Sequence, residues 1–328
     1  MSSMVATLGV IFVTILWGSW FQTVKHIKTF PVHAFITLMY GLSLFVVWVP
    51  IALFGNVLIP DGIFNEIGSN TGLALFVVVC GICFGTGMQM HLSIVKRIGL
   101  ILSTSVSASC AILGGTIVTI LFSELPEGVT IPLLILVSVL LILATVVCQY
   151  AGILRDKDKG IIVEETQASR TKDVLSLAFI NLVLLSSYAL ANSVALKTPT
   201  NLNGFASLTN MGLLVIGAFV GSLCVTLYKQ NKEGGLNFDC GVSKGKLVGL
   251  AFIAACCHFG GNVLHTLFAP VISVTIATAL GNSYHLWSYV WGLAYGEFKG
   301  SSKKTYGVLA FGVLLFIVGV LIISLKAV

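Results

Sequence analysis

The sequence predicts an all-α membrane protein with ten transmembrane helices, arranged as two inverted repeats of five helices each. Three observations support this fold class: the composition, the recurrence of apolar segments and the placement of the basic residues. Hydrophobic residues make up 57% of the 328 positions, and charged residues make up only 9%. Soluble domains carry charge on about a quarter of their residues, so we expect this chain to lie in a lipid bilayer.

Apolar segments of about 20 residues recur along the chain, and this length crosses ~30 Å of hydrocarbon at 1.5 Å per residue. The longest polar stretch falls near the middle of the sequence. The ten expected helices span residues 4–24, 32–54, 72–92, 99–122, 130–152, 173–195, 204–228, 246–267, 271–295 and 305–325.

Lysine and arginine accumulate in alternate loops. Of the 18 basic residues, 16 follow the first, third, fifth, seventh or ninth expected helix, and only Lys197 and Lys326 lie on the other side. Short cytoplasmic loops retain basic residues, so both termini are expected on the non-cytoplasmic side. This topology accounts for the net charge of +6, and we expect no nucleic-acid partner.

The two halves of the chain match each other at an offset of 173 residues: Gly87-Met88-Gln89 aligns with Gly260-Gly261-Asn262, and Cys83 aligns with Cys256. Five helices per half is an odd number, so the second copy is inverted, as in many secondary transporters. The expected parts are a first repeat (1–154), a cytoplasmic connecting loop (155–172) and a second repeat (173–328).

Catalytic and metal-binding motifs are missing from the sequence. It contains no P-loop, no zinc-ligand spacing and no nucleophile elbow, and no Asp or Glu lies in the middle of an expected helix. Seven of the eight cysteines lie in apolar segments, where free cysteine packs as a small hydrophobe. We therefore expect a protein that is not an enzyme and that needs neither a metal nor a cofactor.

Polar side chains at membrane depth are costly, and they often mark a site. His258, Asn262 and His265 follow the spacing i, i+4, i+7, so they share one face of the eighth expected helix. Aromatic rings can cover the apolar face of a sugar, while amide and imidazole groups bond its hydroxyls. The same groups suit a heterocycle or a ureide. The predicted solute-binding residues are Trp17, Gln89, Tyr188, Asn192, His258, Asn262, Asn282 and His285.

Transport coupled to protons requires a group that changes charge within the membrane. Without a carboxylate at membrane depth, only histidine does so near neutral pH. His258 and His285 lie near the middle of their expected helices and are the proton-coupling candidates. A facilitator that needs no coupling ion is the alternative.

Three stretches resemble the drug/metabolite transporter superfamily, and within it the rhamnose-proton symporters: Lys25-His26-Ile27-Lys28-Thr29-Phe30-Pro31, Gly85-Thr86-Gly87 and the segment from Gly296 to Thr305. The resemblance covers nearly the whole chain but is loose in most helices. The last segment is also similar to the ureide permeases. The resemblance implies a proton-driven importer of a monosaccharide of the L-rhamnose type in the cell inner membrane. Met88-Gln89-Met90-His91 stands where the sugar symporters tend to have Gly-Asn and aromatic residues, which leaves the particular sugar open.

Two other functions are weighed against sugar transport. A permease for ureides, nucleobases or other small nitrogenous metabolites shares the same polar groups. A receptor or membrane enzyme that does not carry solute belongs to another class, and it usually adds a soluble domain or clustered acidic motifs. Here the longest loop has about 20 residues, which disfavours this class. The sequence leaves the oligomeric state open.

Overall fold

The computed structural model describes residues 1–98, 100–123, 125–160, 167–233 and 241–326. These residues form helices joined by turns, and they contain no strand beyond an isolated bridge between Leu196 and Phe205. The predicted all-α character is thus confirmed for the described part of the chain. Part of the expected connecting loop, residues 161–166, lies outside it.

Eight helical segments of the described chain are long and apolar enough to cross a membrane. They are formed by α1 (Ser3–Ser19) with η1 (Trp20–His26), α2 (Val32–Leu58), α4 (Thr71–Ile98), α6 (Ile131–Asp158), α7 (Gln167–Phe179) with η2 (Ile180–Leu185) and α8 (Ser187–Ala195), α9 (Ser207–Glu233), α10 (Lys244–Ala255) with η3 (Cys256–Gly260) and α11 (Gly261–Ile272), and α14 (Lys303–Ser324). Multiple apolar helices of this length indicate a multi-pass membrane protein.

The other helical elements are short, apart from α5. They are α3 (Ile63–Ser69), α5 (Leu100–Phe122), α12 (Val274–Gly281), η4 (Asn282–Tyr284) and α13 (His285–Ala294). Helix α5 has 23 residues, and its stretch Val106–Phe122 is apolar. The ninth expected helix, 271–295, is divided into α12, η4 and α13, and the short α3 was not expected.

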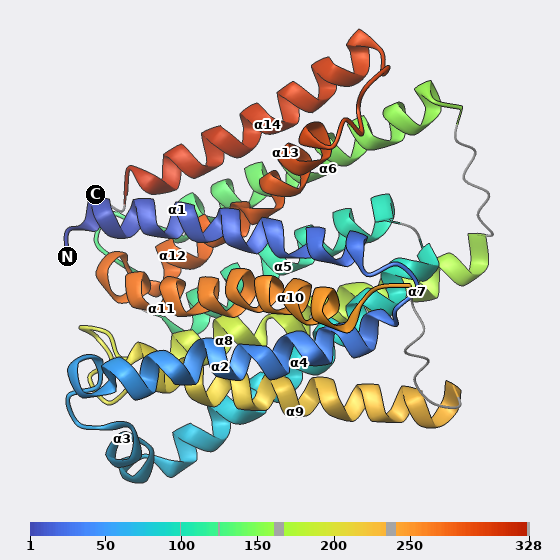
Figure 1. The fold of residues 1–328 in the computed structure, drawn as a ribbon. Helices are drawn as coiled ribbons and strands as arrows, with labels where there is room; N and C mark the ends of the chain where they lie inside the picture. Colours follow the sequence, from blue (N-terminus) through green and yellow to red (C-terminus); the bar gives the residue numbers. More distant parts are fainter. Residues whose placement is uncertain (99, 124, 161–166, 234–240, 327–328) are drawn as a thin grey trace.

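The long helices lie side by side, and α1 begins at the same end of the bundle at which α14 ends (Figure 1). We call this the terminal end. Lys25, Arg155 and Glu297 meet at the opposite end, where Lys303 also begins α14. We call that end the basic end.

Helices α4 and α9 cross in direct backbone contact. Gly81 and Gly85 on α4 face Leu214 and Ala218 of α9, and a Cβ atom at either glycine would collide with a carbonyl oxygen of α9. A Cβ atom at Gly217 of α9 would likewise collide with the carbonyl oxygen of Val78. Small residues four apart allow such close approach in lipid, where dispersion contacts drive helix association.

We expect Gly217→Ala to destabilise the protein, because the added methyl group overpacks the crossing of α4 and α9. Overpacking of this kind costs about 1–3 kcal/mol. The matched control is Gly249→Ala on α10, where no atom lies within 4 Å of the added Cβ. That substitution should be neutral or stabilising by up to about 1 kcal/mol, because alanine favours helix. Thermal unfolding in detergent compares the two, and an equal melting temperature would contradict the close crossing.

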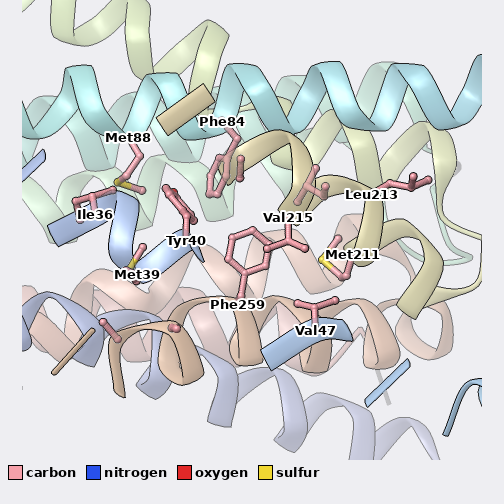
Figure 2. Packing of buried hydrophobic residues seen from close by; sticks show 14 of the residues in the cluster. Ile36, Met39, Tyr40, Val47, Phe84, Met88, Met211, Leu213, Val215 and Phe259 are labelled. Carbon is pink, nitrogen blue, oxygen red and sulfur yellow. The ribbon is translucent and has the colours of Figure 1, made fainter. Parts of the chain in front are cut away.

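A hydrophobic cluster joins α2, α4, α9 and η3 (Figure 2). Tyr40, Phe84, Val215 and Phe259 point toward one another in its centre (Figure 2), and the Phe259 side chain is fully buried. Phe84 is shared with the cavity described next, so this cluster supports one wall of the site.

Candidate functional site

A cavity of about 490 Å³ lies inside the bundle. Residues of α1, η1, α4, α5, η2, α8, η3, α11, α12, η4 and α13 line it. The structure brings six of the eight predicted solute-binding residues to its wall: Trp17, Tyr188, His258, Asn262, Asn282 and His285. His265, which shares a helix face with His258 and Asn262, lines the same wall.

Each segment in which the helical hydrogen-bonding pattern changes contributes to the cavity. The 3-10 segments η1 and η4 supply Gln22 and Asn282, and the π segments η2 and η3 supply Asn181 and His258. Departures from α geometry at membrane depth are tolerated where the backbone lines a cavity or is covered by protein, and they often occur at functional sites. The cavity therefore coincides with the irregular parts of the fold.

Trp17 lies at the centre of one aromatic group. Its ring centroid is 5.0 Å from that of His265, 5.9 Å from Tyr188 and 6.2 Å from Tyr284. The hydroxyl group of Tyr188 lies 3.1 Å from Nδ1 of His265. A Cβ atom at Gly281 would come within 2.9 Å of the Trp17 ring, so this glycine gives the indole its place.

His258 lies in a second aromatic group. Its ring stacks on Phe84 with centroids 5.7 Å apart and an angle of 5° between the planes. Trp20 approaches it edge-on at 5.1 Å and Tyr40 at 5.8 Å. These rings fix the orientation of the imidazole, whose Nδ1 has no hydrogen-bond partner among the described residues.

Buried polar atoms without a hydrogen-bond partner gather on the cavity wall. Within the described residues they are Nε1 of Trp17, Oε1 of Gln22, Nδ1 of His258, Nδ2 of Asn262, Nε2 of His265, Nδ2 of Asn282 and Nε2 of His285. A buried polar group left unpaired costs about 1–3 kcal/mol, so native proteins keep few of them. Seven on one wall form a surface with unused hydrogen-bonding capacity.

A further polar group was not among the predicted site residues. His91 on α4 and Asn181 on η2 line the cavity together with Ser107 of α5. The Ser107 hydroxyl lies 3.2 Å from Nδ1 of His91, and the Asn181 amide donates to Ser107 at 3.3 Å. Spacing along one helix could not reveal this group, because its members come from three different helices.

Two predicted residues lie outside the cavity wall. The Gln89 amide donates to Oγ of Ser222 at 2.7 Å and to the carbonyl oxygen of His33 at 2.9 Å, so it ties α4 to α9 and α2. Oδ1 of Asn192 accepts a hydrogen bond from Asn210 at 2.9 Å, between α8 and α9. Both side chains bond neighbouring helices.

Charged groups meet at the basic end of the cavity. Among the described residues that line it, Lys25 and Glu297 are the only charged ones, and they form an ion pair of 2.8 Å. Arg155 approaches the same carboxylate at 3.2 Å. The charged groups of the wall are thus paired with each other. The described residues contain no group of three or more His, Cys, Asp or Glu side chains that could hold a metal ion.

The fold and the cavity define a multi-pass helical membrane protein with a cavity in the bundle that is lined by aromatic and polar side chains. No protein-family model and no curated protein matches the sequence. Seven chains of known structure match the fold. One of them, described as "Crystal structure of protein", superposes with a TM-score of 0.62 over 100% of this chain and 98% of its own, at 16% sequence identity. At this identity the likeness shows a shared fold alone.

Proposed function

We propose that this protein is a secondary active transporter that imports a small polar solute, foremost a sugar of the L-rhamnose type, together with protons. The observation that carries the proposal is the cavity within the bundle, in which aromatic rings and seven unpartnered polar atoms line one wall. Rings pack on the apolar face of a sugar, and amide and imidazole groups bond its hydroxyls. The solute is uncharged, because Lys25 and Glu297 neutralise each other and offer no free ion-pair partner.

Alternating access fits a bundle of ten spans, in which α5 and the α12–α13 segment complete the eight long helices. An offset of 173 residues would relate α1 to α7–α8, α2 to α9, α4 to α10–α11, α5 to α12–α13, and α6 to α14. The packing supports this relation. Helix α1 contacts α11 as α8 contacts α4, and α2 contacts α10 as α9 contacts α4. Inverted repeats of this kind enclose a central site and rock around it.

The orientation follows from the same arrangement. We place the basic end in the cytoplasm and both termini outside, in the inner membrane of the cell, because basic residues are retained on the cytoplasmic side. The common location of the start of α1 and the end of α14 supports this placement (Figure 1).

Flux into sealed proteoliposomes tests the proposal. We expect protein-dependent uptake of labelled L-rhamnose that rises when the lumen is made alkaline relative to the outside. Competition by unlabelled compounds distinguishes the two transport functions: inhibition by L-rhamnose supports a sugar transporter, and inhibition by allantoin or uracil supports a permease for nitrogenous metabolites. Binding or conversion of solute without accumulation would instead support a receptor or an enzyme.

A further inference from the structure

A second cavity, of about 560 Å³, lies near the terminal end of the bundle. The ends of α5, α8 and α11, the start of α12 and the loops beside them line it. The central cavity extends in the other direction, to Lys25 and Glu297 at the basic end. The two cavities therefore occupy opposite parts of the molecule.

The same four helices line both cavities. On α8, Ala189 lines the central cavity and Ser193 lines the second one, and on α12 the corresponding residues are Thr278 and Val274. Four residues of α-helix rise about 6 Å, so the separation between the two linings is thin along both helices. Helices α5 and α11 pass from one cavity to the other in the same way.

Mostly buried side chains occupy the helices between the two cavities. On α8, Ala191 and Asn192 lie between the two lining residues and are at most 1% exposed, beside the partly buried Leu190. On α12, residues 275–277 lie between the lining residues and are also at most 1% exposed. Asn192 is held by Asn210 of α9. Buried side chains of both helices therefore form a layer that separates the two cavities.

The lining of the second cavity has the chemistry of a surface for neutral, hydroxylated solutes. No charged side chain is found among its described lining residues, which include Ser123, Ser193, Thr198 and Asn201. The hydroxyl oxygens of Ser123 and Ser193 are buried and have no hydrogen-bond partner within the described residues. Ser193 is only 8% exposed, so its unpartnered hydroxyl group is a property of the cavity and not of the open surface.

We propose that the second cavity is the far vestibule of the solute pathway, where a neutral hydroxylated solute binds next to Ser123 and Ser193 before or after it crosses the layer at Asn192. This inference rests on the proposed transport function. It assigns a separate binding site on the non-cytoplasmic side, and it makes Asn192 a part of the barrier between two sites.

The test uses two cysteine variants one helical turn apart, Ala189→Cys and Ser193→Cys, in the full-length protein with its eight native cysteines replaced. A membrane-impermeant maleimide is applied to vesicles of each orientation. We expect Ser193→Cys to react at least about tenfold faster from the side of the termini, and Ala189→Cys at least about tenfold faster from the opposite side, because a closed layer limits access to each thiol. Leu202→Cys, at a residue 71% exposed beside the second cavity, calibrates the labelling from the side of the termini.

Reaction of both thiols from the same side, or no reaction of Ser193→Cys from either side, would overturn the vestibule. If Ser193→Cys does not fold, Ser123→Cys in the lining of the same cavity allows the same measurement of labelling rate from each side. L-rhamnose at tens of millimolar should slow labelling of Ser193→Cys several-fold while gluconate does not, and equal labelling with both would overturn the solute site. Flux measured in vesicles of the unmodified protein keeps the two hypotheses apart: transport by that protein with same-side labelling of the variants rejects only the vestibule, whereas side-specific labelling of the variants without any flux through the unmodified protein rejects the transport function.

Discussion

Replacement of Trp17 by alanine is expected to lower the initial rate of solute uptake about a hundredfold at low solute concentration. The substitution removes the central ring of the aromatic group and a buried indole N–H without a partner in the described structure. Loss of a buried aromatic anchor costs about 2–4 kcal/mol of binding, and each 1.4 kcal/mol is about tenfold. The measurement is the concentration dependence of uptake in proteoliposomes that contain equal amounts of folded protein.

A milder variant separates the ring from its hydrogen bond. Trp17→Phe keeps an aromatic surface but loses Nε1, so we expect a loss of about threefold to tenfold, the effect of one hydrogen bond of about 1 kcal/mol. The matched control is Trp291→Phe on α13, because the Trp291 indole donates to Ser19 and does not line the cavity. Unchanged apparent affinity in both Trp17 variants would place the solute site elsewhere.

Replacement of His258 or His285 by glutamine is expected to abolish accumulation of solute against its gradient. A pH difference of one unit corresponds to 1.36 kcal/mol, so strict one-to-one symport accumulates solute up to about tenfold per unit. Glutamine retains polar atoms but cannot carry the proton. Uptake driven by a pH gradient should therefore fall to simple equilibration, while exchange of labelled for unlabelled solute continues. Parallel measurement of both activities in each variant reads out the coupling.

The control for these variants is His26→Gln, since His26 is exposed at the end of η1 and does not line the cavity. It should accumulate solute as the unmodified protein does. Full accumulation in both His258→Gln and His285→Gln would show that these histidines are structural. A protein whose uptake never responds to a pH gradient would instead be a facilitator.

The fold followed from the sequence where it depends on segment length and hydrophobicity. Long apolar segments predicted α2 and α14 to within a few residues, because crossing a bilayer imposes both a length and an apolar surface. The division of 271–295 into α12, η4 and α13 was not predicted. Ser273, with φ 81°, separates α11 from α12, and the 3-10 turn η4 separates α12 from α13. Both are local changes of backbone conformation that leave the hydropathy of the segment unchanged. The short α3 was not predicted either, because its 7 residues are too few to produce the hydropathy signal of a membrane-spanning helix.

The residues of the cavity wall were predictable where one helix carries several polar residues on one face. His258 and Asn262 reach the cavity as their spacing indicated. Gln89 was indistinguishable from them by sequence, because hydropathy does not tell whether an amide faces a cavity or the hydroxyl of Ser222 on a neighbouring helix. Asn181 escaped selection because its polar neighbours, His91 and Ser107, lie on other helices, and the sequence does not show that these helices meet there.

The interruptions of regular helix at η1, η2, η3 and η4 give the protein its natural points of bending. A helix bends at small energetic cost where its i to i−4 hydrogen bonds are interrupted, whereas a regular helix resists bending. Of the predicted solute-binding residues on the cavity wall, His258 and Asn282 lie on these segments, and the other four lie on the helices that adjoin them. In the proposed mechanism, solute binding and bending of these helices therefore occur together. A ligand that contacts both Trp17 and Asn282 would favour one angle between their helices. By linkage, a change of that angle would change the affinity for the ligand.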